Sequence, residues 1–568
     1  MQTLEKLQAA LLAVLASFLL IACGGGGGGN TTTGVTPLPV ATATITSTVT
    51  AIVSGVVRYE RVGFNAASGA LDYGNISALP VRGATVELVF AGNAIASTQT
   101  NAFGQYSFSA APGSTTLAIR VRAELKQASG AAQWDVTVRD NTNADALYTL
   151  QSVNFNSGVG ATQNLTAASG WGGASYTSAR VAGPFAILDT IYESQQKVLA
   201  AQSNTIFPAL KAFWSINNNT GSGQLFDGDI GTSFFSELSN GTVISERRMY
   251  ILGRENNDTD EYDGSVVAHE WGHYYQSALS RDDSMGGRHG GVDDRLDRRI
   301  AFSEGWGNAW SGIAQSRSSY SDSSGNSQGS GFVLALNSGY NTALGGAKGW
   351  FREQSVQYII WSLSAQAGFQ GIHQTLTGNT FRTSAALSDI HSFAAAYRLT
   401  ASATSTSALN ALLSSESINT NSDMFGSAES NNGGDTVTLP YYRQIATLGN
   451  PVVLSAGQTI CTTAQYTTFK NSPSASDGDR NKLGHFVYAR FTLASPATRT
   501  ITVVGSPASG VDTDFEIHSA GQRVAVAETA LNQTETLTNA FASGDYVLVI
   551  YDFNKASPGN TCYSVSIQ

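Results

Sequence analysis

The hydrophobic and polar residues of this chain follow different spacings along its length. In residues 51–165, short runs rich in valine, tyrosine and phenylalanine are separated by glycine, proline and asparagine, as at 53–60 and 84–90. The segment 96–110 divides into two such runs around the turn sequence Asn-Ala-Phe-Gly. Several short strands separated by turn signals predict a β-sandwich.

In residues 166–450 the spacing becomes helical. Hydrophobic residues recur every three to four positions at 184–201, 355–368 and 390–399. Between the expected helices lie glycine- and serine-rich segments, including 316–331, which we interpret as loops. We therefore expect a mainly α domain of the α+β class in the middle of the chain.

From residue 451 to 568 the alternation of strands returns. The expected strands cover 486–493, 498–505, 512–520 and 544–553. They predict a second β-sandwich. A chain of 568 residues is also too long for one hydrophobic core. The sequence thus predicts a multidomain protein, with a β-sandwich, a mainly α domain and a further β-sandwich.

The N-terminus has the features of an export signal. An apolar run at 9–22 follows a lysine and is too short to span a membrane comfortably, which is typical of a signal peptide over residues 1–22. The run ends in Leu-Ile-Ala followed by Cys23, which resembles a bacterial lipobox and implies lipidation of Cys23. Gly24 at the next position implies the outer membrane. The alternative is an ordinary secretion signal with an incidental cysteine.

Residues 23–50 are low in complexity and cannot form a core, so we expect a tether between membrane and fold. Charged residues make up only 13% of the chain and the net charge is −10. A protein that binds nucleic acid needs lysine and arginine to neutralise phosphates, so no nucleic-acid partner is expected. The two remaining cysteines, Cys461 and Cys562, are expected to form a disulfide in an exported protein.

The middle of the chain contains the sequence His269-Glu270-Trp-Gly-His273, which fits the H-E-x-x-H pattern. On a helix, His269 and His273 lie within about 40° of each other on one face. The opposite face carries the apolar residues Val267, Trp271, Tyr274 and Ala278. The two imidazoles therefore point away from the apolar stripe, where they could share a metal ion. Chance occurrence of the pattern is the alternative.

A catalytic zinc site needs a third protein ligand. The metzincin pattern is excluded, because Gln276 and Leu279 occupy the positions of its glycine and third histidine. The candidates are Glu304, which opens a second apolar helical pattern, and His289. Asn308 lies one turn after Glu304 and could accept a hydrogen bond from a ligating imidazole. Glu304 could instead be an ordinary helix-terminal acid.

The sequence VVAHEWGHYY followed by AFSEGWGNAW resembles the gluzincin, or thermolysin-like, zinc metallopeptidases. The resemblance implies that His269, His273 and Glu304 hold Zn²⁺ and that Glu270 is the general base acting on a zinc-activated water. The chain departs from the family at Asn308, where these enzymes carry aspartate. A longer loop also separates the two motifs.

Peptide hydrolysis further requires a group that stabilises the developing oxyanion. Tyr358 is the first candidate, followed by Tyr340 and His391; a buried structural role is the alternative for each. The expected function is that of an exported, lipid-anchored zinc metallopeptidase acting on a protein or peptide substrate. The alternative is a surface-binding or adhesion lipoprotein with an inactive core. A structural zinc site is disfavoured, because no cysteine lies near these motifs.

Acidic residues crowd around the expected metal helix. They are Asp282, Asp283, Asp293, Asp294 and Asp297, together with the segment 256–264. One interpretation is a Ca²⁺ site, although the spacing does not match an EF-hand. The favoured interpretation is a solvated acidic rim, with Asp263 capping the N-terminus of the metal helix.

The two flanking domains also resemble known modules. VSGVV, PVRGATVEL and TNAFGQYSF resemble transthyretin-like, carboxypeptidase-regulatory domains. DTDFEIHSAGQRVA with FASGDYVLVIYDF resembles the bacterial pre-peptidase C-terminal domain. Both resemblances imply modules that accompany a peptidase.

Overall fold

The computed structural model describes most of the chain from residue 51 onward. The described residues are 51–110, 116–158, 160–240, 243–287, 289, 295–344, 346–433, 442–448, 454–462, 483–506, 510–530, 532–553 and 561–568. The expected signal peptide, Cys23 and the tether lie outside them, so the lipid anchor stays a prediction. No helix among these residues is long and apolar enough to cross a membrane.

The first sheet forms around the long strand β1 (Ala51–Phe64). Its other strands are β2 (Leu71–Pro80) and β5 (Gln105–Ala110), which run antiparallel to β1, and β10 (Gly160–Thr162) and β11 (Leu165–Ala167), which run parallel to it. Val53, Val57 and Tyr59 alternate along β1 and are fully buried in the main core. This alternation confirms the strand expected at 53–60.

The second sheet has nine strands and continues into the helical part of the chain. Its main path is β13 (Phe234–Ser239), β14 (Ile244–Ile251), β12 (Leu210–Trp214), β7 (Trp134–Asp140), β6 (Leu117–Gln127), β3 (Ala84–Phe90) and β4 (Asn93–Gln99), with β8 (Ala146–Leu147) and β9 (Thr149–Gln151) at the side. β12 pairs with β7, placing Leu210 opposite Val136. The sheet therefore crosses the boundary expected at 165/166, and the strands on both sides share one core.

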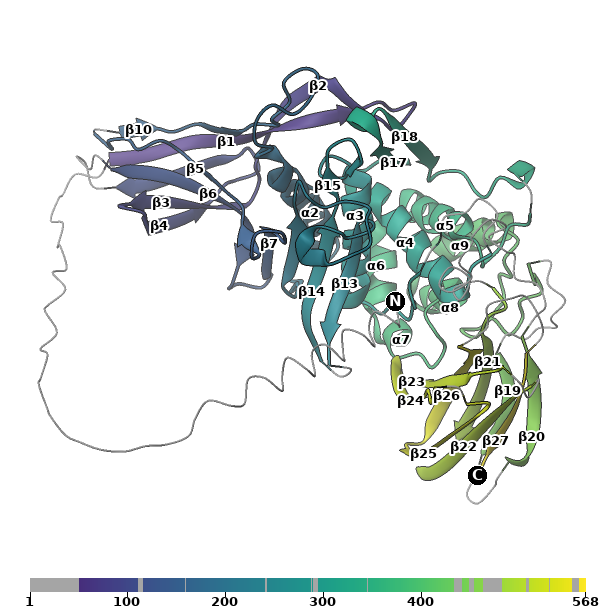
Figure 1. Cartoon of the computed structure of the whole chain (residues 1–568). Helices are drawn as coiled ribbons and strands as arrows, with labels where there is room; N and C mark the ends of the chain where they lie inside the picture. The colour runs from purple at the N-terminus through teal and green to yellow at the C-terminus, as the bar shows by residue number, and fades with distance from the viewer. Residues whose placement is uncertain are drawn as a thin grey trace, which may run out of the picture.

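Helices fill the middle of the molecule beside this sheet (Figure 1). They are α2 (Ala182–Ala201), α3 (Gly264–Leu279), α4 (Arg298–Gln315), α5 (Glu353–Ala367), α6 (Phe369–Thr377), α7 (Asn379–Arg382), α8 (Ile390–Thr400) and α9 (Ala403–Ser415). The helices expected from hydrophobic spacing are confirmed as α2, α5 and α8, with small differences at their ends. At the centre, Trp310 stacks against both Trp271 and Trp306, and all three are fully buried.

Two small hairpins lie near the N-terminal end of α3. They pair β15 (Gly253–Arg254) with β16 (Asp258–Thr259), and β17 (Ser319–Ser324) with β18 (Ser330–Ala335). Short 3₁₀ turns occur at η1 (Leu225–Asp227), η2 (Asn326–Gln328) and η3 (Thr342–Leu344). The expectation of a loop over 316–331 is therefore wrong. Its buried positions are held by hydrogen bonds from serine and glutamine, which give no apolar pattern.

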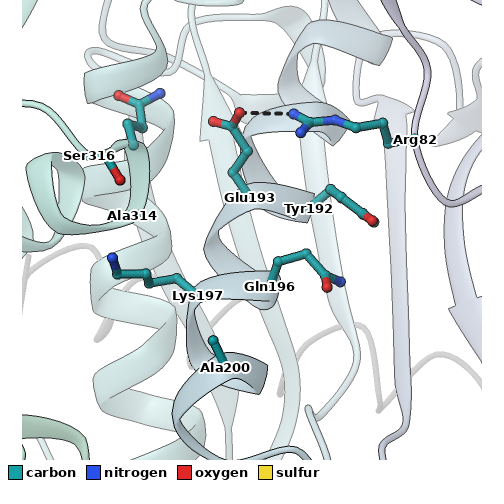
Figure 2. Close-up of a pocket in the computed structure, with 9 residues that line it drawn as sticks. Arg82, Tyr192, Glu193, Gln196, Lys197, Ala200, Ala314 and Ser316 are labelled. Carbon is teal, nitrogen blue, oxygen red and sulfur yellow. Dashed lines mark hydrogen bonds and ion pairs between the residues drawn. The ribbon is translucent and has the colours of Figure 1, made fainter. Parts of the chain in front are cut away.

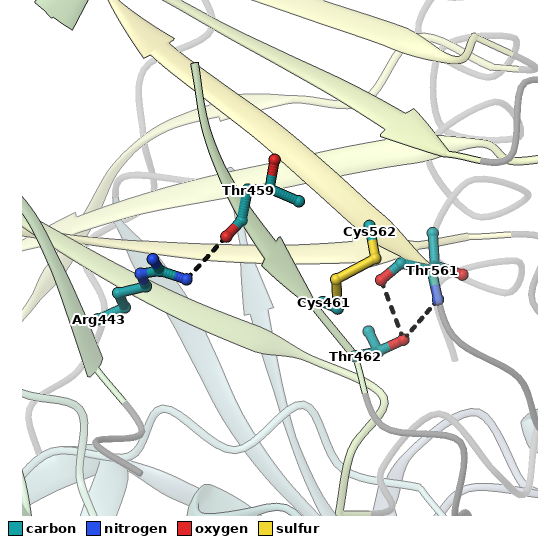
Figure 3. Close-up of a disulfide and its surroundings, with 6 residues drawn as sticks. All are labelled: Arg443, Thr459, Cys461, Thr462, Thr561 and Cys562. Carbon is teal, nitrogen blue, oxygen red and sulfur yellow. Dashed lines mark hydrogen bonds between the residues drawn. A yellow bond between two sulfur atoms is a disulfide. The ribbon is translucent and has the colours of Figure 1, made fainter. Parts of the chain in front are cut away.

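The C-terminal part of the chain forms two sheets around a separate core. Their strands are β19 (Tyr442–Leu448), β20 (Leu454–Cys461), β21 (Val487–Leu493), β22 (Ala497–Ser506), β23 (Thr513–Ser519), β24 (Gln522–Ala527), β25 (Thr534–Phe541), β26 (Gly544–Asp552) and β27 (Cys562–Ile567). The expected sandwich strands are confirmed. β19 precedes the boundary expected at 450/451, yet it pairs with β21 in this sandwich. Figure 3 shows the disulfide between Cys461 and Cys562, which face each other on β20 and β27.

The C-terminal sandwich contacts the first turn of α4. The Tyr488 hydroxyl donates to Asp297, whose carboxylate also accepts from the backbone N–H of Arg299 at 3.1 Å and so caps the helix. Arg298 places its guanidinium 4.4 Å from the ring centre of Tyr442. These contacts fix the N-terminus of the helix that carries Glu304.

Candidate metal centre

The helix α3 presents two opposite faces, as its sequence predicts. Val267, Trp271 and Tyr274 are fully buried in the core. His269 and His273 lie on the other face, which is turned toward α4. The two helices approach closely at glycines: a Cβ at Gly307 would lie 2.8 Å from the His269 ring, and one at Gly272 would lie 3.1 Å from the Cα of Gly307. The glycines of the two motifs therefore let the imidazole reach the neighbouring helix.

His269, His273 and Glu304 bring three ligand atoms together. The Nε2 atoms of the two histidines are 3.0 Å apart. Glu304 Oε2 lies 3.2 Å from Nε2 of His269 and 3.4 Å from Nε2 of His273. Tetrahedral zinc with bonds of about 2.0–2.1 Å separates its ligand atoms by roughly 3.3 Å. The three donors thus have the identity and the spacing that zinc requires.

Amide oxygens fix the orientation of both imidazoles. The Nδ1–H of His269 donates to Asn308 Oδ1 at 2.8 Å, and the Nδ1–H of His273 donates to Gln276 Oε1 at 3.3 Å. This orientation presents both Nε2 atoms toward Glu304, where they would offer their lone pairs to a metal ion that displaces the ring protons. Sequence reasoning considered Gln276 only as the residue that excludes the metzincin pattern and missed this orienting role.

The Asn308 side chain also explains why an aspartate is absent at this position. Its amide nitrogen donates to Oε1 of Glu353 at 2.5 Å and to Oε1 of Gln357 at 2.9 Å, both on α5. An aspartate here would place a second carboxylate against Glu353, and no amide hydrogens would remain to separate them. The Asn308 amide therefore stands between the His269 imidazole and the Glu353 carboxylate and is hydrogen-bonded to both.

The charges around Glu304 favour a cation at this point. Burial acts to raise the pKa of Glu304, but His289 and His273 outweigh it and hold this pKa well below its usual range. Burial likewise acts to lower the pKa of His273, but the Glu304 carboxylate raises it to about 10. His289 places its Nε2 3.2 Å from Glu304 Oε2 and its Nδ1 3.1 Å from Glu353 Oε2. It therefore lies beside Glu304, outside the group of three ligand atoms.

Glu270 lies between the two histidines in the sequence and is 8% exposed. Burial raises the pKa of its carboxyl above the ordinary value, against the opposing effect of the neighbouring histidines. The backbone of Phe235, on the edge strand β13, hydrogen-bonds to it. A carboxyl group with a raised pKa is suited to accepting and returning a proton near neutral pH.

Among the tyrosines that the structure describes, Tyr320 is the one whose ring lies beside a ring of the triad. It stands on β17 with its ring centre 6.0 Å from that of His269. Burial raises the pKa of Tyr320 well above its ordinary value, so its hydroxyl stays a hydrogen-bond donor. The sequence did not point to Tyr320, because it lies in the serine-rich segment interpreted as a loop.

The three residues that the sequence suggested for stabilising the oxyanion lie in surroundings that do not include the triad. Tyr358 packs against the main core from α5, and no contact joins it to the triad in the described part of the chain. The Tyr340 ring lies 4.4 Å below the Arg352 guanidinium. His391 is buried, with its Nε2 2.9 Å from Glu429 Oε2.

The expected solvated acidic rim is wrong for Asp263, Asp283 and Asp297, whose side chains are buried, whereas Asp282 is exposed as expected. Asp293 and Asp294 lie outside the described residues. Asp263 is 1% exposed and its side chain makes no hydrogen bond to α3; instead its carboxylate accepts from Ser323 on β17. Asp283 forms a buried ion pair with Arg281 at 2.8 Å. Asp282 accepts from Ser303 at 2.8 Å. A second group of potential metal ligands consists of Asp258, Asp260 and Asp322.

A surface pocket lies away from these groups. Figure 2 shows it between α2 and the end of α4, with Arg82 paired to Glu193 at 2.9 Å. Its remaining lining residues are Tyr192, Gln196, Lys197, Ala200, Ala314, Gln315 and Ser316. None of them belongs to the triad.

Comparison with known proteins assigns no family. No family model matches the chain, and no curated protein matches it. The pre-peptidase C-terminal domain of a collagenase from Bacillus anthracis is 18% identical over 23% of this chain and 100% of its own, with a TM-score of 0.15. PliG, a periplasmic inhibitor of g-type lysozyme from Aeromonas hydrophila, is 17% identical over 22% of this chain and 98% of its own, with a TM-score of 0.13. At these TM-scores neither similarity assigns a fold or a function.

Proposed function

We propose that this protein is a zinc-dependent metallopeptidase in which His269, His273 and Glu304 hold the metal. The observation that supports it most is the convergence of these three donor atoms from two helices at the separations of a tetrahedral zinc site. Two imidazoles and one carboxylate leave a fourth position open, which distinguishes catalytic from structural zinc.

The residues around the metal would divide the chemistry among them. When bound, zinc supplies Lewis acidity, which makes a water more acidic and polarises a peptide carbonyl. Glu270 accepts the proton of the attacking water and delivers it to the departing amine. Asn308 and Gln276 keep the imidazoles in the ligating tautomer.

Tyr320 is our candidate for stabilising the developing oxyanion. Its protonated hydroxyl stands beside His269 on a strand fixed to the rest of the site by hydrogen bonds.

The cellular location of the protein is a further part of the proposal. The apolar run before Cys23 supports an exported lipoprotein, and Gly24 after it supports the outer membrane. Fatty-acid labelling that persists in Cys23→Ser would contradict this location.

The test compares wild-type protein with Glu270→Gln. Both are loaded with zinc, analysed for metal content and incubated with a general protein substrate such as casein. We expect one zinc per chain in each, and hydrolysis slower by about 100- to 10,000-fold in the variant, because only the proton acceptor is lost. Equal hydrolysis by both would refute the role of Glu270. A zinc-loaded wild type without hydrolysis would instead favour a binding or adhesion protein with an inactive core.

A further inference from the structure

Four aspartates from two distant parts of the chain lie together at the N-terminal end of α3. Asp258, Asp260 and Asp263 belong to the segment that leads into this helix, and Asp322 lies on β17. One carboxylate oxygen each of Asp258, Asp260 and Asp322 lies within 4.8 Å of the others. Asp263 joins them through its bonds to Ser323, the neighbour of Asp322. None of these residues belongs to the zinc triad.

These carboxylates are buried without a counter-cation. Asp260 is 3% exposed and Asp263 is 1% exposed, while Asp258 and Asp322 are half-buried. Within the described ranges none of the four forms a salt bridge, whereas the adjacent Glu261 pairs with Arg180 at 2.8 Å. Arg61 and Arg317 act on the charge of Asp263 without forming an ion pair with it. A buried charge is costly unless it is paired or binds a metal, so Asp258, Asp260 and Asp322, which have no cationic partner among the described residues, favour a bound cation.

Several oxygens in this cluster have no hydrogen-bond donor. One buried carboxylate oxygen of each of Asp258, Asp260 and Asp263 is without a partner. The same is true of Oε1 of Gln328, a neutral side chain that is 1% exposed. The Gln328 amide lies within the cluster, because its nitrogen donates to Ser323 Oγ at 3.1 Å and interacts with Asp258. Buried acceptors without donors are rare in folded proteins.

The second carboxylate oxygens of Asp260 and Asp263 accept hydrogen bonds that orient them. The Ser233 hydroxyl donates to Oδ2 of Asp260. The backbone and hydroxyl of Ser323 donate to Oδ2 of Asp263. Each of these carboxylates is thus fixed through one oxygen and keeps the other without a partner. This arrangement is a built site, unlike an exposed acidic patch whose side chains are free to turn to solvent.

We propose that Asp258, Asp260 and Asp322, assisted by Gln328, bind a calcium ion that fastens β17 to the N-terminal end of α3, while Asp263 holds the same strand through Ser323. Calcium takes six to eight oxygen ligands at about 2.3–2.6 Å, so oxygens on opposite sides of it are separated by about 4.8 Å. Magnesium uses one or two carboxylates and keeps most of its waters, and zinc prefers nitrogen and sulfur. The half-buried Asp258 and Asp322 leave room for water to complete the shell.

Protonation is the alternative way to neutralise these groups. Burial raises the pKa of Asp258 to about 6 and that of Asp263 to about 7. The carboxyls could therefore share protons in the absence of a cation. A proton-sharing cluster would not respond to calcium at neutral pH, so the two cases are separable by experiment.

The calcium site would also affect the zinc centre through one strand. Tyr320 is two residues before Asp322 on β17, with its ring 6.0 Å from that of His269. An ion that holds Asp322 against the N-terminal end of α3 would therefore hold Tyr320 beside the triad. Only this consequence rests on the proposed function; the calcium site itself does not.

The experiment measures thermal unfolding of the full chain after removal of metals and return of one equivalent of zinc. Calcium chloride or magnesium chloride is then added to wild type, Asp260→Asn, Asp322→Asn and the exposed control Asp227→Asn. At millimolar concentration, we expect calcium to raise the Tm of wild type and Asp227→Asn by at least about 3 °C, with a smaller effect of magnesium. Asp260→Asn and Asp322→Asn should not respond.

Two results make the outcome decisive. Without calcium, Asp260→Asn should unfold at or above the wild-type Tm, because it removes a buried unpaired charge; this separates a lost site from a damaged fold. Calorimetry should count one calcium per wild-type chain, also in the zinc-ligand variant Glu304→Gln. The proposal is overturned if wild type binds no calcium, or if both cluster variants keep the full Tm increase. Failure of zinc binding alone would leave the calcium results unaffected.

Discussion

Two clusters of potential metal ligands lie along α3, and they differ in the chemistry of their donor atoms. On the face of the helix, Glu304 is surrounded by the imidazoles of His269, His273 and His289. At the N-terminal end of the helix, four aspartates are buried or half-buried, and three of them have a carboxylate oxygen without a partner. Nitrogen donors mixed with one carboxylate suit zinc and leave a reactive position open, whereas oxygen donors alone suit calcium. The kind of donor atom, more than the number of acidic residues, distinguishes a catalytic metal site from a structural one.

The strand β17 connects the two clusters, and substituting Tyr320 tests this connection most strongly. We expect Tyr320→Phe to lower kcat by about 100-fold while zinc and calcium contents stay unchanged, because one donor to the oxyanion is lost. Tyr358→Phe is the matched control, and it should retain wild-type kcat. The reverse ranking of the two variants would restore Tyr358 as the residue that stabilises the oxyanion.

A smaller effect is expected from the amide that orients the first cluster. Asn308→Ala should weaken zinc binding by about 10-fold or more, since His269 loses the acceptor that fixes its tautomer. Asn308→Asp should not improve on wild type, because the new carboxylate faces Glu353. Competition with a zinc chelator measures both. Tighter zinc binding by Asn308→Asp would contradict the role assigned to Glu353.

The sequence allowed the first cluster to be predicted. For the second it indicated only the segment 256–264 as part of one possible Ca²⁺ site, without Asp322 or Gln328. His269 and His273 are one helical turn apart, so their common face follows from the periodicity of a helix, and the apolar pattern around Glu304 indicated its partner helix. Asp263 and Asp322 are separated by about 60 residues, and aspartate is frequent on protein surfaces. Nothing in the local pattern shows that such residues are buried together.

The difference between local periodicity and contacts of distant residues also explains which parts of the fold could be predicted. Helices such as α5 and the strands of the C-terminal sandwich bury apolar residues at regular spacing, and the sequence located them. The strand β17 buries Ser321 and Ser323, whose burial depends on partners such as Asp263 far along the chain. The pairing of β12 with β7 is equally remote, so the continuous sheet across residue 165 could not be anticipated.

The most direct test of two separate metal sites along α3 is elemental analysis of the full chain after dialysis against zinc and calcium together. Wild type should contain one zinc and one calcium per chain. Glu304→Gln should lose the zinc and keep the calcium, and Asp260→Asn should lose the calcium and keep the zinc. A wild type without zinc, or a Glu304→Gln variant that retains it, would contradict the assignment of the triad as the zinc site.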